Sequence, residues 1–295
     1  MTDDGQIAAF MAQAGLPASF ADLVARLHIP LAARIAEMAA GREEPLVVGL
    51  SGPQGSGKST LTALVTQLLR SRGLRTANLS LDDLYLTQAE RKRLGQTVHP
   101  LLRTRGAPGT HDIALGLGAL DDLTRAGPAL IPRFDKVTDD RAPAADWERF
   151  DGPADVILLE GWCIGARPQS EAALIEPVNA LERDEDPAGV WRRYANAALA
   201  GPYRALFDRI DLLVAMTAPD FPTVRVWRGQ QEQRLRDSLA AQGRDPALAM
   251  DEAALDRFVA HYQRLTAWIA EDLSPRADIA IRLDANRQPL ELRGL

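Results

Sequence analysis

The feature that most constrains the fold of this 295-residue chain is a glycine-rich loop at residues 52–59. It reads Gly-Pro-Gln-Gly-Ser-Gly-Lys-Ser and matches the pattern G-x-x-x-x-G-K-[ST]. A chain with 22 glycines and three lysines is expected to contain this pattern by chance only roughly 0.001 times. An apolar run precedes the loop at 46–50, and leucines and a valine follow it at helical spacing over 61–69. The sequence therefore predicts a strand, a phosphate-binding loop (P-loop) and a helix in succession.

The rest of the chain predicts an α/β fold around this unit. Five short apolar runs read as buried parallel strands, at 46–50, 76–81, 155–160, 210–217 and 279–283. Helical patterns lie between them, at 190–206 and 255–269 among others. This alternation predicts a three-layer P-loop NTPase fold, with a mostly parallel central sheet flanked by helices. We expect an N-terminal helical extension over 1–44 and one main domain over 45–295.

Composition and charge exclude several classes of protein. A hydrophobic fraction of 46% with 25% charged residues is typical of a globular chain and argues against disorder. The net charge of -6 disfavours a nucleic-acid binder or a protein of anionic membranes. A single cysteine, Cys163, allows no internal disulfide, and the N-terminus carries no basic, apolar leader. We therefore expect a soluble, cytoplasmic protein, and the oligomeric state stays open.

The P-loop predicts the residues that hold a nucleotide. Glycines let the backbone curl so that its N–H groups, from about Gly55 to Thr60, point at phosphates, and the helix N-terminus adds a favourable dipole. Lys58 should reach the β- and γ-phosphates, and the Ser59 hydroxyl should bind Mg²⁺. The predicted nucleotide-binding residues are Gly52, Pro53, Gln54, Gly55, Ser56, Gly57, Lys58, Ser59 and Thr60.

Acidic residues follow two of the predicted strands. Asp82 and Asp83 end the second run, and Glu160 ends the third. Ligands of open parallel sheets lie beyond the carboxyl ends of the strands, so these acids are candidates for a general base or for a magnesium ligand. The alternative for Asp82 and Asp83 is a helix cap or a turn.

Beyond the P-loop, five further motifs make the sequence resemble a known enzyme group. They are 80–87 (SLDDLYLT), 105–112 (RGAPGTHD), 132–136 (PRFDK), 160–162 (EGW) and 227–232 (WRGQQE). With these motifs the chain resembles the P-loop kinases that include uridine kinase, phosphoribulokinase and pantothenate kinase, and most closely the D-glycerate 3-kinase family. The resemblance covers most of residues 46–285.

The resemblance implies an ATP-dependent kinase that phosphorylates a small hydroxyl compound. It places Asp82 at the position of the catalytic base, beside Lys58, and Glu160 at the acid that accompanies Mg²⁺. The segment 132–141 resembles the uridine kinase stretch that contacts the acceptor, which makes four residues candidates for acceptor binding: Arg133, Asp135, Lys136 and Arg141.

A basic stretch adds further candidates on the acceptor side. Residues 91–111 contain five arginines or lysines, two histidines and no acid, which suits an anionic acceptor gripped by Arg105. His111 could contact substrate or make a structural hydrogen bond, and residues 91–93 fit a solvated helix face. Asp83, Tyr85 and Asp112 complete the candidates, although Tyr85 is apolar enough to belong to the core.

The segment 220–245 is a candidate lid. Its arginines include Arg225, Arg228 and Arg234, which could close over bound phosphates. The alternative is a helix with ordinary surface ion pairs, such as Glu232 with Arg228 or Arg236.

Two classes of function stay open. The first is phosphoryl transfer from ATP to D-glycerate, or to another small acceptor such as a nucleoside, a sugar phosphate or pantothenate. The second is an NTPase whose nucleotide switches its conformation. The Asn-Lys-x-Asp motif of guanine-specific switches is absent, because Lys136 is the last lysine. The sequence therefore favours a kinase.

Overall fold

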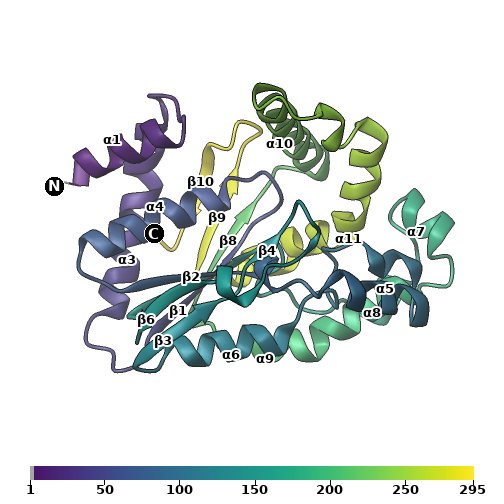
Figure 1. The fold of residues 1–295 in the computed structure, drawn as a ribbon, viewed down its shortest axis with the longest axis horizontal. Coiled ribbons are helices and arrows are strands. Elements are labelled where there is room, and N and C mark those ends of the chain that lie inside the picture. Colours follow the sequence, from purple (N-terminus) through teal and green to yellow (C-terminus); the bar gives the residue numbers. More distant parts are fainter. Residues whose placement is uncertain (1–2) are drawn as a thin grey trace.

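A six-stranded sheet forms the centre of the computed structural model, which describes residues 3–295 (Figure 1). The strands lie in the order β10 (Pro289–Arg293), β9 (Ile279–Leu283), β8 (Leu212–Thr217), β1 (Leu46–Ser51), β7 (Val156–Gly161) and β2 (Thr76–Ser80). All neighbours pair in parallel except β10, which is antiparallel to β9. The predicted α/β class is confirmed.

All five predicted strands are present, and each begins and ends within two residues of its apolar run. The run 279–283 coincides with β9, and 210–217 begins two residues early, because Ile210 and Asp211 lie in the turn before β8. Strand β10 has no counterpart in the prediction. It is an edge strand in which Leu290 and Glu291 are exposed, so it lacks the continuous apolar run by which the other five were recognised.

The N-terminal helices and α4 (Lys58–Ser71) cover one face of the sheet. The chain runs through α1 (Asp3–Gln13), α2 (Phe20–Leu23), a π-helical turn (Val24–His28) and α3 (Ile29–Ala39). Leu31 and Ile35 of α3 belong to the same buried cluster as Leu64 of α4 and Val48 of β1. This segment is therefore part of the layer that buries the sheet.

Four further helices cover the opposite face: α6 (Ile113–Leu123), α8 (Val190–Ala200), α9 (Pro202–Phe207) and α11 (Glu252–Arg276). The helical pattern over 190–206 is confirmed, but it forms two helices, because Gly201 ends α8 and Pro202 starts α9 at its first position. Tyr203 of α9 and Leu273 of α11 are fully buried and belong to the same apolar cluster as Leu159 of β7.

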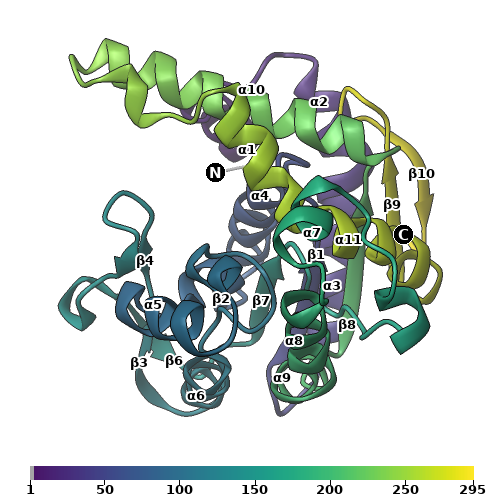
Figure 2. The ribbon, with the colours of Figure 1, turned by 90° about the vertical axis from the view of Figure 1, so that its right-hand side faces the viewer.

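Most of the remaining elements project beyond the carboxyl ends of the strands. On one side lie α5 (Gln88–Thr97) and the two-stranded ribbon of β4 (Phe134–Asp135) and β5 (Asp140–Arg141). Helix α7 (Ala180–Glu185) also lies there, whereas a second ribbon, β3 (Gly127–Ile131) with β6 (Glu148–Gly152), runs beside the sheet and leads into the amino end of β7. On the other side, α10 (Phe221–Ala241) extends over the end of the sheet (Figure 2). Most of the candidate lid is thus one long helix.

Within residues 3–295, none of the helices is both long and apolar enough to cross a membrane.

Candidate active site

The P-loop connects β1 to α4 with the geometry that its glycines predict. Gly57 directly precedes α4 with a φ of 91°, and Gly55 has a φ of 75°, which is a backbone conformation that favours glycine. Lys58 is the first residue of α4, so its ammonium group lies where the helix N-terminus attracts anions. The loop can therefore bind a phosphate through backbone N–H groups, the helix dipole and one positive charge.

Helix α10 rests directly on the P-loop. A Cβ atom on Gly55 would lie 2.6 Å from the Cβ of Trp227, and Trp227 is fully buried. The Trp227 indole N–H donates to the carbonyl of Ala285 at 2.8 Å. Arg287 stacks on the indole, 5.1 Å from the ring centroid, and donates from Nε to the carbonyl of Gly55 at 2.5 Å. The loop, α10 and the β9–β10 turn thus form one continuous contact, which the sequence did not predict.

We expect Gly55→Ala to weaken nucleotide binding at least about tenfold, because the added methyl group would push Trp227 and α10 away from the loop. Titration calorimetry with ATP, the expected nucleotide, measures this change. Gly73→Ala is the matched control. Gly73 has a φ of 84°, and a Cβ atom added there would meet nothing within 4 Å, so this variant introduces backbone strain without a steric clash. Wild-type affinity in Gly55→Ala would contradict a tight contact between α10 and the loop.

Glu160 lies beside the P-loop on the neighbouring strand β7. Ser80, its register partner on β2, donates from Oγ to Glu160 Oε1 at 2.8 Å. Glu160 Oε2 is buried without a hydrogen-bond partner, 3.8 Å from the ammonium nitrogen of Lys58. A buried carboxylate oxygen without a partner is unfavourable, so this atom is available to a ligand.

Asp82 lies in the 3-10 turn that follows β2, with its carboxylate held on both sides. The Tyr85 hydroxyl donates to Oδ1 at 3.0 Å, and the Lys136 ammonium donates to Oδ2 at 2.7 Å. Burial alone would raise the pKa of Asp82, but the positive charges of Lys136 and Lys58 outweigh it and hold the pKa below its ordinary value. Asp82 is therefore ionised at neutral pH and can accept a hydrogen bond or a proton.

A cavity of about 370 Å³ joins these groups. Of the predicted site residues it is lined by Gln54, Gly55, Lys58, Ser59, Asp82, Tyr85, Arg105, Lys136, Glu160, Arg228 and Arg234. Five other residues line it as well: Ser80, Trp162, Gln231, Phe258 and Tyr262. Phe258 and Tyr262 lie within the helical pattern over 255–269, and the sequence does not identify them as site residues, because an apolar helix face that lines a cavity has the same spacing as one that faces the core. Of the remaining P-loop residues, Gly52 and Pro53 are buried in the loop, and Ser56, Gly57 and Thr60 line a second cavity next to the first.

Several predicted acceptor-side residues have structural partners instead and do not line this cavity. Asp83 accepts from the backbone N–H of Phe134 at 3.0 Å and from Arg133 at 3.2 Å, which fixes the β4–β5 ribbon. Burial raises the pKa of Asp83.

Arg141 donates to Asp112 at 2.9 Å, and Asp112 caps α6. Asp135 accepts from the backbone N–H of Val137 and the hydroxyl of Thr138 within the ribbon.

His111 is a buried structural residue of the site wall. Its ring stacks on Tyr85 with 4.5 Å between centroids, and its Nδ1 lies 2.5 Å from the hydroxyl of Tyr203. Burial lowers the pKa of His111 to about 3, so the ring is neutral at physiological pH. Of the two roles expected for His111, the structural hydrogen bond is present. The ring also packs against Tyr85, whose hydroxyl donates to Asp82. Cys163 is a buried free thiol, and burial raises its pKa, so it is not an activated nucleophile.

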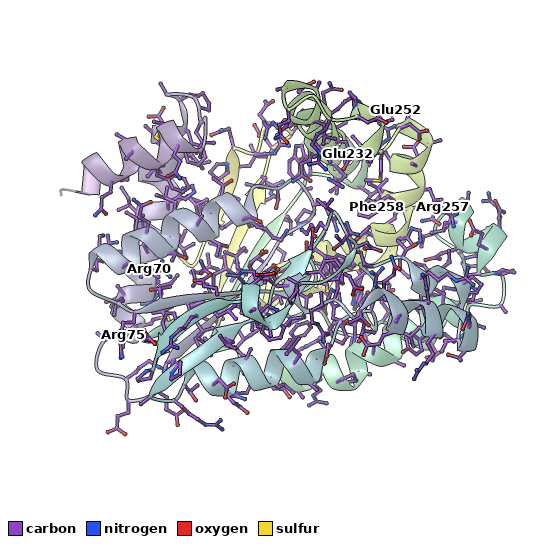
Figure 3. All side chains as sticks on the ribbon, viewed as in Figure 1. Arg70, Arg75, Glu232, Glu252, Arg257 and Phe258 are labelled. Carbon is purple, nitrogen blue, oxygen red and sulfur yellow. The ribbon has the colours of Figure 1, made fainter. Side chains whose placement is uncertain are left out.

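The three candidate lid arginines differ in their surroundings. Arg225 is paired with Glu252 and Asp256 of α11 and lies outside the cavity. Arg228 lines the cavity, and its guanidinium carbon lies 5.0 Å from the ring centroid of Phe258. It also forms an ion pair with Glu232, which the alternative interpretation of this segment predicts. Figure 3 labels Glu232 on α10 and Phe258 and Glu252 on α11. Arg234 lines the cavity and makes no ion pair within the described part of the chain.

Two curated proteins are similar in sequence to most of this chain. The uncharacterized kinase mug58 of Schizosaccharomyces pombe is 30% identical over 261 residues, which cover 83% of this chain and 90% of the relative. The chloroplastic D-glycerate 3-kinase of Arabidopsis thaliana is 32% identical over 265 residues, and the chain spans about half of that protein, 54%. No protein-family model matches the chain.

A solved structure matches almost completely. The D-glycerate 3-kinase from Cryptococcus neoformans superimposes with a TM-score of 0.73 at 27% identity, over 94% of this chain and 99% of that protein. The P-loop, the acidic strand ends and the parallel sheet described above thus belong to a fold that this chain shares, over most of its length, with a D-glycerate 3-kinase. The chain belongs to the family of P-loop kinases that includes mug58 and the D-glycerate 3-kinases.

Proposed function

We propose that this kinase transfers the γ-phosphoryl group of ATP to a hydroxyl group of D-glycerate. The observation that carries the proposal is the cavity at the P-loop, which is lined by Asp82 and its ion-pair partner Lys136 and by Arg105, together with Lys58 and Ser59. A small hydroxy acid needs this combination, which is a base for its hydroxyl and positive charge for its carboxylate. D-glycerate is also the substrate named for two of the similar proteins.

In the proposed reaction, the acceptor hydroxyl oxygen forms a bond to the γ-phosphorus as the bond from that phosphorus to the β–γ bridging oxygen breaks. Asp82 accepts the hydroxyl proton, and ADP leaves with the electron pair of the broken bond. Lys58, Arg228 and Arg234 offset the negative charge of the transferring group from two sides. The ion pair of Lys136 with Asp82 must open first, which frees Lys136 for the acceptor or the phosphate.

Ser59 and Glu160 fit a magnesium ion. Glu160 Oε2 is the buried oxygen without a hydrogen-bond partner, and Ser59 lines the same cavity. No cluster of three acidic, histidine or cysteine side chains is placed to hold a metal within residues 3–295, so phosphate oxygens and water would supply the other ligands, as is usual for Mg²⁺. When bound, the ion would neutralise phosphate charge.

Arg105 is the side chain that we assign to the acceptor carboxylate. The Tyr262 hydroxyl donates to its backbone carbonyl at 3.3 Å, and its guanidinium pairs with Asp139 and packs 5.8 Å from the ring centroid of Phe134. The side chain is thus held in place, while it still borders the cavity. A guanidinium with donors to spare can bind a carboxylate through two parallel hydrogen bonds.

With Mg-ATP, the purified protein should phosphorylate D-glycerate, whereas glycerol, which lacks only the carboxylate, should react at least about 100-fold less efficiently. Arg105→Ala should raise the KM for D-glycerate about tenfold or more, and Arg103→Ala, a nearby exposed arginine outside the cavity, should leave it unchanged. Acceptor-dependent ADP release and ³¹P NMR of the product measure both.

Preferred turnover of a nucleoside, a sugar phosphate or pantothenate would overturn the acceptor assignment. ADP release that no acceptor increases would favour a nucleotide switch instead.

We also propose a reducing compartment such as the cytoplasm, because the one cysteine is a buried free thiol.

A further inference from the structure

A second cavity lies on the other side of the P-loop, between the loop and the N-terminal helices. Its volume is about 270 Å³. The loop and α4 contribute Gly57 and Thr60, and the N-terminal segment contributes Leu16, Phe20 and His28. The β9–β10 turn closes one side. None of these N-terminal residues belongs to a recognised nucleotide-binding motif.

The two cavities are adjacent. Gly55, Gln231 and Arg234 line both of them, so a ligand that crosses the P-loop passes from one to the other. The first cavity contains Lys58 and Asp82, whereas in the second the N-terminal segment contributes mainly apolar side chains and the P-loop, α10 and the β9–β10 turn contribute polar ones. This is the division that a nucleoside triphosphate requires, with its γ-phosphate at one end and its base at the other.

We infer that the N-terminal segment 16–28 forms one wall of the base-binding subsite and that the subsite takes the adenine of ATP. The inference rests on the proposed use of ATP. It gives the N-terminal segment a part in nucleotide binding besides its part in covering the sheet.

The apolar side chains of this wall suit a flat aromatic base. Leu16 and Phe20 are only half-buried although the helices around them are packed, so both have surface left to cover. The Phe20 ring meets His28 edge-on, with 5.2 Å between centroids. Stacking of a base on an aromatic side chain such as Phe20 is favourable for every base, because each presents a flat π-face.

His28 gives the wall a hydrogen-bond acceptor. Its Nδ1 lies 3.3 Å from the carbonyl oxygen of Leu23, which can only accept, so Nδ1 carries the proton. Burial lowers the pKa of His28 to about 4, which keeps the ring neutral and leaves Nε2 with a free lone pair. Adenine has an exocyclic amine that could donate to such an atom, whereas guanine has a carbonyl oxygen at the same ring position.

The local backbone supports a ligand-binding role for this segment. The turn Val24–His28 is π-helical, and π-helical turns inside α-helices are rare and frequently occur at functional sites. This turn places the His28 ring five residues from the carbonyl that orients it.

The test compares ATP with inorganic tripolyphosphate, which presents three phosphates and no base, by titration calorimetry with Mg²⁺. Phe20→Ala should weaken ATP binding about tenfold and leave tripolyphosphate binding unchanged. Phe10→Ala is the matched control, because Phe10 packs against the same buried cluster but does not line the cavity. It should change neither affinity.

A measurement on the wild-type protein removes any dependence on the folding of a variant. Hydrogen exchange of residues 16–28 should slow with ATP and stay unchanged with tripolyphosphate. Unchanged ATP affinity in Phe20→Ala, equal weakening of both ligands, or equal exchange with both would overturn the inference. If ATP binding depends on Phe20 but D-glycerate is not phosphorylated, the base subsite stands and the proposed acceptor falls.

Discussion

Replacing Lys58 with alanine should lower phosphoryl transfer by about 1,000-fold and weaken ATP binding as well. Lys58 is the first residue of α4 and lies between the phosphate-binding loop and Glu160, so its ammonium group adds to the helix dipole where the β- and γ-phosphates bind. Without it, the charge that develops on the transferring group loses its nearest compact cation. Single-turnover rates and titration calorimetry separate the two effects.

Two further variants show whether the charge or its shape matters. Lys58→Arg keeps the charge on a longer, planar group and should recover little activity, because the loop closes tightly around a point charge. Lys92→Ala removes an exposed lysine of α5 outside the cavity and should behave as the wild type. Activity of Lys58→Ala within tenfold of the wild type would exclude Lys58 from the phosphate site.

The sheet could be predicted because its strands are buried on both faces. Such strands have continuous apolar sequences, and all five that were predicted are present. Strand β10 is half-exposed and lacks this pattern. The phosphate end of the site was predictable for a different reason. The P-loop is a local structure, in which glycine conformations and the start of α4 follow from eight adjacent residues.

The acceptor end of the site was predictable only in part, because ion pairs depend on distant residues. The sequence predicts three arginines as acceptor-binding residues, Arg105, Arg133 and Arg141. Only Arg105 lines the cavity. Asp83 and Asp112 lie near the other two guanidinium groups and bind them, and no spacing in the sequence encodes such partners. Arg287 shows the reverse case: it holds the P-loop carbonyl of Gly55 from a turn 232 residues away, without any motif.

Replacing Asp82 with asparagine should lower turnover by about 100-fold or more, with little loss of ATP affinity. The asparagine amide keeps the size of the side chain but cannot take the acceptor proton. It also ends the ion pair with Lys136, which costs the resting enzyme little because that lysine is more than half exposed. Acceptor-dependent turnover and ATP calorimetry, measured on one preparation, separate loss of the base from loss of the nucleotide site.

Asp83→Asn is the matched control for Asp82→Asn, since the two carboxylates are neighbours in the chain and only Asp82 lines the cavity. Asp83 holds the backbone of Phe134 and the guanidinium of Arg133, so its replacement should lower the free energy of unfolding while turnover stays within about tenfold of the wild type. Urea denaturation and turnover together test this division of roles. If Asp82→Asn keeps near-normal turnover and Asp83→Asn loses it, the base is Asp83, and the β4–β5 ribbon must move to bring the acceptor to it.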